Sequence, residues 1–236
     1  MAAAPTAKSK PLLLVTGLKR EARIGAGEGI VTVCSAGDPA LLRSRLSELP
    51  AQDFSGVISF GIAGGLSPSL RTGDVVIASG VVSENVHHPV DEAWALSLAS
   101  HIAPHMPLER GLIAGVEAVL LHASHKTEAH RKTRAIAVDM ESHIAAAYAK
   151  EHGLPFVAIR AISDPASRGL PRIAADALKP DGSVDMLKVL TGICRDPSQI
   201  PALIAAGRDS KRAFEALRRV RGLPGFFFGL GLPDFR

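Results

Sequence analysis

In three segments of the chain, an apolar stretch ends in glycine or acidic residues, and these are the first candidates for functional residues. They are GIAGG (61–65), VDME (138–141) and ISD (162–164). In an open α/β sheet, ligands bind beyond the carboxyl ends of the strands. Small residues let a flat ligand lie against backbone N–H groups, and a carboxyl group placed beside the ligand can act as a general acid or base. The three segments are therefore candidate parts of one binding site.

Each segment also has a purely structural explanation. The glycines at 61–65 are compatible with an ordinary turn. Glu141 lies where a helix is expected to begin, and the helix dipole stabilises an acid there by about 0.3–1 kcal/mol. Asp164 precedes a proline, and an Asp in that place is a common loop or cap residue. The order and spacing of the three segments, rather than any one of them, favour a function.

The elements that must position these residues follow from the alternation of short apolar runs with helical patterns, which is typical of βαβ units. We expect helices over 38–49, capped by Asp38 with Pro39 at the first position, and over 140–152, ended by Gly153. We expect strands over 11–16, 29–35, 56–60, 73–82, 110–114, 135–138 and 155–162. These elements predict a single α/β domain over 11–206.

Length and composition agree with such a domain. The chain has 236 residues, of which 47% are hydrophobic, enough for a core without disulfide or metal. Cys34 and Cys194 match no metal or redox spacing, so we predict free thiols in the reducing cytosol. Residues 1–10 are expected to be a disordered leader. The apolar run after them covers only 12–15, too short for a signal peptide or a membrane span.

The net charge of +4 is concentrated near the C-terminus. Residues 207–222 contain six basic side chains against Asp209 and Glu215, so the rest of the chain is neutral. A neutral body predicts no nucleic-acid surface. We expect residues 207–236 to form a basic helix and an apolar tail, LPGFFFGLGLPDF. Such a tail is typical of a membrane-interface contact, and the alternative is a tail docked on its own domain or on a dimer partner.

Together, GIAGGL, GDVV, VDMES and PFVAIRAISDPA resemble the nucleoside phosphorylase and nucleosidase family, which includes the methylthioadenosine/adenosylhomocysteine nucleosidases and the purine nucleoside phosphorylases. The resemblance covers about residues 11–167. With DGSVDMLKVL and RDPSQIPALIAAGRDSKRAFEALRRV, the chain resembles the hopanoid-associated phosphorylase branch, which removes adenine from adenosylhopane. The resemblance implies a three-layer α/β/α sandwich with a mixed central sheet, phosphorylase/hydrolase-like. It also implies a homodimer that needs no metal and no cofactor.

The resemblance gives Asp164 and Ser163 a role at the base. Cleavage of a ribosyl C–N bond pushes electrons onto the purine, which leaves more readily when its N7 is protonated. Asp164 is the implied acid and Ser163 the residue that orients it, a form of catalysis that contributes about 10²–10⁴-fold. Asp164 must then hold a proton, which an apolar strand end favours. Ala63 and Gly64 are implied to line the base pocket.

At the sugar, the resemblance implies that Glu141 binds the ribose hydroxyls and supports the cationic ring that develops. Met140 is implied to pack against the ribose. His88 is expected at the mouth of the pocket, while the other histidines are expected to be solvated or satisfied, with no metal site.

The attacking group stays open from sequence. In hydrolytic relatives a carboxylate after the first strand activates water, and Glu21 or, in another alignment, Ala22 takes that position. Glu21 is equally well explained as a first-turn helix residue favoured by the dipole. A phosphorylase needs an anion site instead, and the candidates are the Gly17 turn with Lys19 or Arg20 nearby and the segment Gly37-Asp-Pro at another strand end. Phosphate is therefore the alternative co-substrate.

Two departures from the family pattern bear on the substrate. Residues 115–119 lack the aromatic residue that relatives use to stack on the base. The stretch 80–94 is shorter than in the small-substrate nucleosidases. A clipped loop would leave room for a large 5′ substituent, although loss of a neutral loop explains it equally well.

We therefore predict an enzyme that cleaves a purine nucleoside, with adenosylhopane, a lipid-linked nucleoside, as the preferred substrate. The alternatives are a methylthioadenosine/adenosylhomocysteine nucleosidase or purine nucleoside phosphorylase, and a non-catalytic nucleoside- or lipid-binding regulator. We expect the protein in the cytoplasm, with peripheral contact at the inner membrane through the tail.

Overall fold

The computed structural model describes residues 10–171, 173, 185, 188, 191 and 195–224. The predictions for residues 1–9, for Cys194 and for the phenylalanine-rich end after residue 224 lie outside the described residues.

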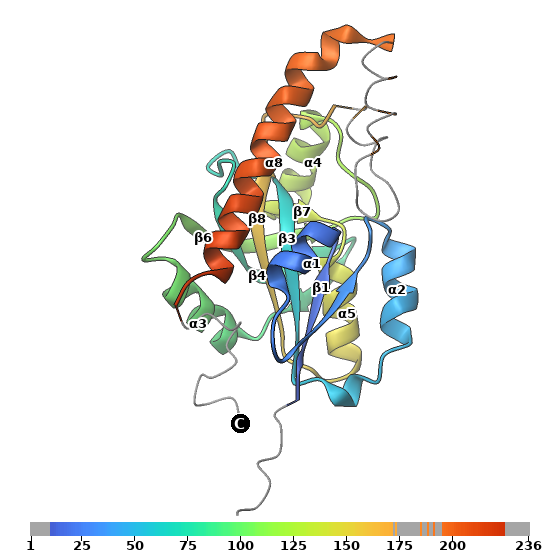
Figure 1. Ribbon diagram of the computed structural model, residues 1–236, viewed down its shortest axis with the longest axis vertical. Coiled ribbons are helices and arrows are strands. Elements are labelled where there is room, and N and C mark those ends of the chain that lie inside the picture. Colours follow the sequence, from blue (N-terminus) through green and yellow to red (C-terminus); the bar gives the residue numbers. More distant parts are fainter. Residues whose placement is uncertain are drawn as a thin grey trace, which may run out of the picture.

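Within the described residues, eight strands form one mixed sheet (Figure 1). The strands are β1 (Leu12–Thr16), β2 (Ile30–Cys34), β3 (Gly56–Gly65), β4 (Val75–Ser83), β5 (Val86–Pro89), β6 (Leu108–Gly115), β7 (Ala137–Asp139) and β8 (Phe156–Asp164). The helices are α1 (Lys19–Gly25), α2 (Pro39–Ser47), α3 (Glu92–Ile102), α4 (Ala123–Thr133), α5 (Ser142–Glu151) and α8 (Ile200–Arg221), with short 3-10 turns η1 (Ala51–Asp53) and η2 (Pro197–Gln199).

The sheet contains both parallel and antiparallel pairs, which confirms the predicted mixed sheet. β1 runs parallel to β2 and β3, and β3 runs parallel to β8. β8 is antiparallel to β4, which is parallel to β6. β6 is parallel to β7, and β7 returns antiparallel to β3. The strands β3, β8, β4, β6 and β7 therefore close into a ring, which brings the ends of β3, β7 and β8 together.

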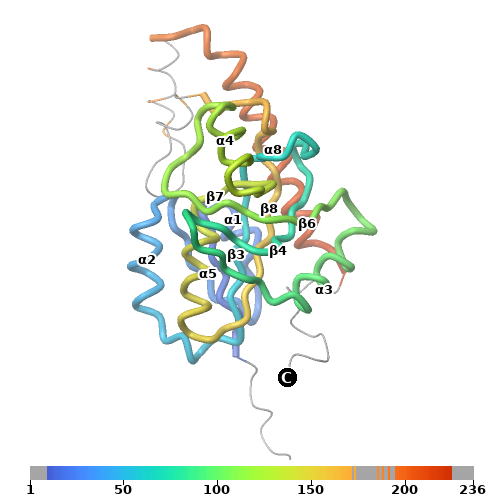
Figure 2. The backbone as a smooth tube through the Cα atoms, turned by 180° about the vertical axis from the view of Figure 1, so that it is seen from behind, coloured from blue at the N-terminus to red at the C-terminus, as the bar shows by residue number. Residues whose placement is uncertain are grey.

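Helices cover both faces of the sheet, as the three-layer prediction requires. Successive side chains of a strand point to opposite faces. On β1, Leu12 and Leu14 pack in a cluster with residues of α3 and α8, whereas Leu13 and Val15 pack in another with residues of α2 and α5. Figure 2 shows α2 and α5 together on one side of the molecule, away from α3 and α8.

Local signals explain where two helices begin. The Asp38 side chain accepts hydrogen bonds from the N–H groups of Ala40 and Leu41, and Pro39 opens α2, which confirms the predicted cap. α5 begins at Ser142, with Glu141 at the N-cap position rather than inside the helix. Gly153 follows α5 with φ of 63°, a left-handed conformation that favours glycine.

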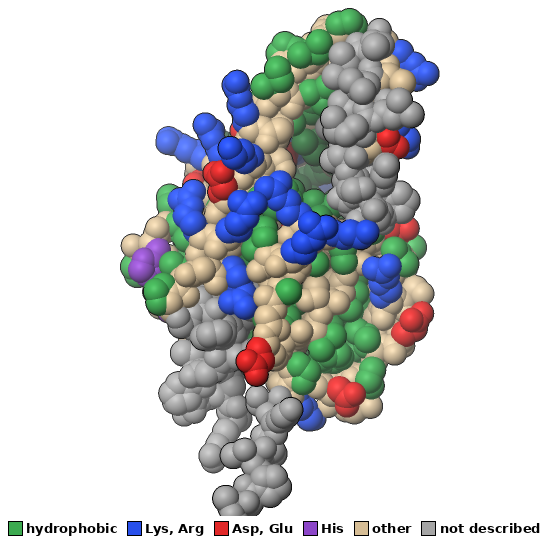
Figure 3. Space-filling model, viewed as in Figure 1, with side chains coloured by type: hydrophobic (Ala, Val, Ile, Leu, Met, Phe, Trp, Pro, Cys, Tyr) green, Lys and Arg blue, Asp and Glu red, His purple; other side chains and the backbone are tan. Residues whose placement is uncertain are grey.

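The basic helix differs from its prediction. α8 begins at Ile200, so the boundary expected after residue 206 lies inside a continuous helix. Its apolar stripe is buried against β8, through Ala213, Phe214, Leu217 and Val220. The helix therefore docks on the body of its own domain and turns its Lys and Arg side chains outward (Figure 3). No helix in the described part of the chain is both long and apolar enough to cross a bilayer.

The structure adds two elements that the sequence patterns did not reveal, β5 and α3. It also corrects the glycine-rich segment 61–65, which was expected to be a turn. This segment is the end of β3, because its backbone pairs with β8 on one side and its last residues pair with β7 on the other.

Candidate active site

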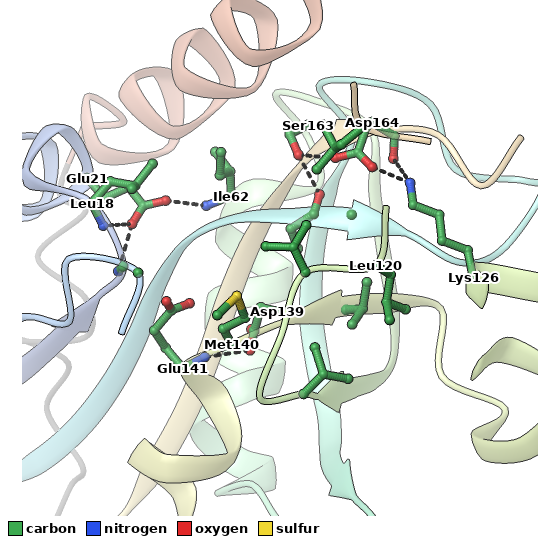
Figure 4. Close-up of a pocket in the computed structure, with 18 residues that line it drawn as sticks. Leu18, Glu21, Ile62, Leu120, Lys126, Asp139, Met140, Glu141, Ser163 and Asp164 are labelled. Atoms are coloured by element: carbon green, nitrogen blue, oxygen red, sulfur yellow. Dashed lines mark hydrogen bonds and ion pairs between the residues drawn. The ribbon is translucent and has the colours of Figure 1, made fainter. Parts of the chain in front are cut away.

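The three chemically interesting strand ends meet at one point. Gly64 of β3 lies in register with Val138 of β7 and with Asp164 of β8. A cavity of about 150 Å³ opens there (Figure 4). All but one of the predicted site residues line it, namely Gly17, Glu21, Ala63, Gly64, Met140, Glu141, Ser163 and Asp164. Glu141 and Asp164 thus face one cavity, as a shared substrate requires.

Asp164 reaches the cavity through a β-bulge. Ala63 pairs with Ile162, but the next residue of β3, Gly64, pairs with Asp164, so Ser163 is an extra residue in β8. Bulges re-aim side chains and are common beside active sites. The Ser163 Oγ lies 2.5 Å from the Oδ1 atom of Asp164 and 3.1 Å from the carbonyl oxygen of Ala63. The Ser163 hydroxyl is therefore in direct contact with Asp164, and its role in orienting the acid stays a prediction.

Lys126 of α4 makes the strongest contact to Asp164. Its ammonium group forms an ion pair with the Oδ2 atom of Asp164 and donates a hydrogen bond to the carbonyl oxygen of Pro165 at 3.0 Å. The side chains are 1% and 6% exposed, so the pair is shielded from water. Lys126 was not predicted from the sequence, because the residues around it have the pattern of a polar, solvated helix.

A buried ion pair holds the other carboxylate in position. Asp139 accepts N–H hydrogen bonds from Glu141 at 3.1 Å and Ser142 at 2.8 Å, which fixes the turn that presents Glu141. The Nε atom of Arg160 donates to Asp139 at 2.5 Å, and the guanidinium also donates to Ser59 and Ser142. Burial alone would raise the pKa of Asp139, but Arg160 and Ser142 outweigh it and lower this pKa.

Arg160 was also missed from sequence. It lies inside the apolar run PFVAIRAI and is 1% exposed. A buried charge must be paired, so an arginine in a strand that reads as buried is the signal that could have revealed this pair.

Glu141 is a buried acid without a cation in direct contact. Its Oε1 atom accepts a hydrogen bond from the Oγ of Ser35 at 3.0 Å. Burial and the nearby charges of Asp139 and Glu21 raise its pKa to about 7, although Arg160 and Ser35 pull it down. Glu141 therefore changes charge near neutral pH.

Glu21 lies beside Glu141 but is committed to the backbone. Its carboxylate accepts N–H hydrogen bonds from Gly17, Leu18 and Ile62, at 2.8, 2.7 and 2.8 Å. These bonds cap the start of α1 and tie it to β3. Burial still raises the pKa of Glu21 above its usual value. Glu21 thus lies in the first turn of a helix, as its structural explanation requires, and a role as general base stays a prediction.

Two glycines are required by the close approach of these acids. A Cβ atom on Gly17 would lie 2.6 Å from the Oε1 atom of Glu141. A Cβ atom on Gly61 would lie 2.7 Å from the carboxyl carbon of Glu21. Real Cβ contacts are essentially never that short, so glycine is needed at both positions for the acids to occupy their places.

The remaining wall of the cavity is aliphatic. Val116, Val119 and Leu120 line it in the region where relatives place an aromatic residue. A flat ligand would lie between these side chains and the backbone of Ala63 and Gly64. The described lining of the cavity contains no aromatic side chain.

The structure does not bring His88 to this cavity. His88 is buried in a second hollow that is also lined by His143 and Glu117. Burial, followed by the charges of Lys150, His143 and His87, lowers its pKa. The expectation that His88 lies at the pocket mouth is wrong for this cavity, because β5 turns back against β4 and carries His88 to that hollow instead. In the described ranges, no three His, Cys, Asp or Glu side chains gather so as to hold a metal ion.

Lys19 and Arg20, the candidate anion ligands, are not at the cavity either. They line a separate hollow of about 750 Å³ between α1 and α8, together with Arg23, Arg218 and Arg221. Figure 3 shows Lys and Arg side chains in a band across this face.

Comparison with known proteins places the chain in a family. A family model described as the phosphorylase superfamily matches residues 27–179. The chain is 31% identical over 148 residues to the 5'-methylthioadenosine/S-adenosylhomocysteine nucleosidase of Marinomonas sp. strain MWYL1. That alignment covers 52% of this chain and spans only 62% of the relative.

Solved structures share the fold. The 5'-methylthioadenosine/S-adenosylhomocysteine nucleosidase of Helicobacter pylori superposes with a TM-score of 0.64 at 15% identity, covering 91% of this chain and 98% of that one. The futalosine hydrolase of the same organism gives 0.64 at 14% identity, covering 89% and 97%.

Proposed function

The chain belongs to the phosphorylase superfamily, and on that premise we propose that it cleaves the N-glycosidic bond of a purine nucleoside. The observation that carries this proposal is the pair of buried acids, Glu141 and Asp164, that face one cavity from neighbouring strand ends. Small residues of β3 and aliphatic side chains form the surface between them, on which a flat base can lie.

The reaction divides between the two acids. Asp164 gives a proton to N7 of the purine, so that the base leaves as a neutral molecule. Glu141, when ionised, accepts hydrogen bonds from the ribose hydroxyls and stabilises the positive charge that develops on the sugar. Met140 lines the cavity beside Glu141 and packs against the ribose.

A product assay tests this function and identifies the attacking group. Purified protein is incubated with a purine nucleoside, with and without phosphate, and free base is measured together with ribose or ribose 1-phosphate. Free base that appears without phosphate indicates hydrolysis, and strict dependence on phosphate indicates phosphorolysis. Binding of the nucleoside without any release of base would support the non-catalytic regulator instead.

Glu21→Gln sharpens the assay. If Glu21 activates water, the amide abolishes hydrolysis, because an amide cannot accept the proton. If Glu21 serves only as the helix cap, one amide oxygen still accepts N–H hydrogen bonds, and turnover falls by less than about 10-fold.

For the substrate, we propose a nucleoside with a large apolar 5′ group, of which adenosylhopane is the named candidate. The support is the short connection between β4 and β5, in which Ser83 pairs with Val86 and Glu84 adopts a φ of 52°. A competition assay, in which the rates of cleavage of adenosylhopane and methylthioadenosine are compared, tests this proposal. Efficient cleavage of methylthioadenosine alone would refute the lipid-linked substrate.

We further propose that the α1–α8 hollow contacts an anionic membrane surface. Arg20 stacks on Phe214, with its guanidinium carbon 4.1 Å from the ring centroid, and burial together with the charge of Arg218 lowers its pKa. The basic residues thus repel one another, and anionic headgroups relieve that repulsion.

Flotation with vesicles of phosphatidylglycerol or phosphatidylcholine measures this contact. Arg20→Glu with Arg218→Glu is expected to abolish binding to the anionic vesicles. The matched control, Arg131→Glu with Lys132→Glu, reverses two exposed charges on α4 and should leave binding unchanged. Equal binding to both lipids would contradict the proposal, as would competition by millimolar inorganic phosphate alone.

A homodimer is proposed on the family resemblance. Light scattering of the purified chain measures its mass against the 24.7 kDa of one copy.

A further inference from the structure

The connection between β6 and α4 forms one wall of the cavity. Its side chains Val116, Val119 and Leu120 line the cavity. Glu117, which lies between them in sequence, lines the second hollow instead. The side chains of this short connection are thus divided between two hollows of the molecule.

The backbone of this connection has few partners of its own. Its first residue is fixed, because the N–H of Val116 donates to the carbonyl oxygen of Asp139 at 2.9 Å. Within the described part of the chain, residues 117–121 form no backbone–backbone hydrogen bond and lie in neither a helix nor a strand. A segment without such bonds opens locally at little cost. The positions of Val119 and Leu120 therefore depend on side-chain contacts.

Glu117 makes those contacts with two helices. Its carboxylate accepts hydrogen bonds from both terminal nitrogens of the Arg43 guanidinium on α2, one of them at 3.0 Å. Its Oε1 atom also lies 2.8 Å from the Nε2 atom of His143 on α5. A bidentate Arg–carboxylate pair fixes geometry more strictly than a single hydrogen bond does. Arg43 and then His143 lower the pKa of Glu117 to about 2, so the carboxylate is ionised at neutral pH.

His143 also packs against the end of β6. The His143 side chain is 7% exposed, and a Cβ atom on Gly115 would lie 2.3 Å from the Cβ atom of His143. Glycine is therefore needed at position 115 for the histidine to occupy its place. His143 thus contacts both the end of the strand and, through Glu117, the connection that follows it.

The pair of Arg43 and Glu117 is too exposed to be explained by stability. The two side chains are 49% and 56% exposed. Ion pairs on the surface contribute little to the free energy of unfolding, because water screens the charges and the side chains lose entropy. Arg110 and Glu92 form another bidentate pair, but neither they nor their neighbours in sequence line the cavity. Glu117 differs in that the residues on both sides of it belong to the segment that forms the wall.

We propose, on the basis of the proposed function, that Glu117 is a positioning residue that holds Val119 and Leu120 against the purine base. Glu117 itself lies outside the lining of the cavity and acts only through the segment that it fixes. Aliphatic contacts to the base are the same in the bound substrate and in the transition state. Loss of contacts of this kind raises KM and leaves kcat nearly unchanged. Glu117 thus sets the affinity for the base, while Glu141 and Asp164 act in the reaction.

Glu117→Ala tests the proposal through the separate effects on KM and kcat. We expect KM for the purine nucleoside to rise about 10-fold and kcat to change less than about 2-fold. Arg43→Met is expected to raise KM less, because the contact with His143 remains. The matched control is Glu92→Ala, which breaks the comparable pair with Arg110 and should leave both constants unchanged.

Two measurements without turnover examine the same point. Calorimetry is expected to show adenine binding about 10-fold weaker in Glu117→Ala than in the wild type. Glu117→Gln keeps an oxygen acceptor of similar reach and should recover most of this loss. Hydrogen exchange of the backbone amides of residues 117–121 is expected to be faster in Glu117→Ala and unchanged in Glu92→Ala. Thermal unfolding of each variant shows that it is folded.

The outcomes separate this proposal from the proposed function. A wild type that binds adenine but cleaves no nucleoside refutes the proposed function, and the role of Glu117 is then decided by adenine affinity and hydrogen exchange. A wild type that does not bind adenine overturns both. Adenine affinity that is unchanged in Glu117→Ala overturns the role of Glu117, as does an equal loss in Glu92→Ala or a fall in kcat without a rise in KM.

Discussion

The two ends of the cavity place the same functional group, a buried carboxyl, in opposite surroundings. At one end, Glu141 lies near Asp139 and Glu21 and receives one hydrogen bond from Ser35. At the other end, Asp164 contacts the ammonium group of Lys126 (Figure 4). Two carboxyl groups in different environments can take different roles in one reaction. The contrast shows that the chemical properties of these two carboxyl groups are set by the residues around them rather than by residue type alone.

Arg160 shows how the contrast is maintained. It could neutralise Glu141, but its guanidinium is already bonded to Asp139, Ser59 and Ser142. Burial and the charge of Asp139 therefore outweigh the attraction of Arg160, and the pKa of Glu141 rises to about 7. Lys126, in contrast, is in direct contact with the carboxylate of Asp164.

Asp164→Asn changes the acid proposed to act on the base and has the largest expected effect on turnover. The amide cannot deliver a proton, so kcat should fall by about 10²–10⁴-fold. Release of purine from the variant is measured beside its thermal unfolding. Near-wild-type release from the folded variant would contradict the mechanism.

Glu141→Gln alters the other end and should separate activity from stability. We expect kcat/KM at pH 8 to fall about 100-fold, because the ionised carboxylate no longer supports the sugar cation. Because burial raises the pKa of Glu141 to about 7, the wild type loses stability as pH rises from the unfolded-state value through about 7.

The variant has no such loss, so its free energy of unfolding at pH 8 should exceed that of the wild type by on the order of 2 kcal/mol. The two proteins should converge near pH 4. Urea unfolding at both pH values measures the two free energies of unfolding. A variant less stable than the wild type at pH 8 would show that the folded protein favours the charged form of Glu141.

Gly17→Ala is expected to disturb only the end of the cavity that contains Glu141. The added methyl group would lie 2.6 Å from the Glu141 carboxylate and must displace it. A displacement of this size costs up to about 100-fold in kcat/KM. Asp164 is expected to bind N7 of adenine, an atom that 7-deazaadenine lacks. Calorimetric binding of the two bases should therefore show the same preference for adenine in Gly17→Ala as in the wild type, and loss of that preference would show that the two ends of the cavity are not independent.

Ser35→Ala has the smallest expected effect. It deletes the 3.0 Å hydrogen bond that lowers the pKa of Glu141. The acidic limb of the kcat/KM profile should therefore move to higher pH, with a loss of about 2- to 10-fold at pH 7. An acidic limb that does not move would indicate that a group other than Glu141 sets it.

The sequence predicted well what depends on local pattern. The cap of α2 by Asp38 and the buried strands before Gly64 and Asp164 are written in short stretches of residues, and the structure bears them out. Glu141 and Asp164 were singled out because each follows a strand.

What escaped prediction depends on partners that are remote in the chain. Lys126 finds Asp164 across 38 positions, and Arg160 finds Asp139 across 21. His88 was misplaced for the same reason, since the hairpin of β4 and β5 determines which hollow it enters. The periodicity of a sequence does not predict such long-range contacts. The one local indication of them is a charged residue inside an apolar run.

The extra residue in β8 has a consequence for how this segment can evolve. Ser163 makes β8 one residue longer than the matching part of β3, and this offset sets Asp164 opposite Gly64. Because side chains alternate along a strand, a deletion of one residue here would turn the acid away from the cavity while leaving the composition almost the same. The segment should thus accept changes of side chain more readily than changes of length.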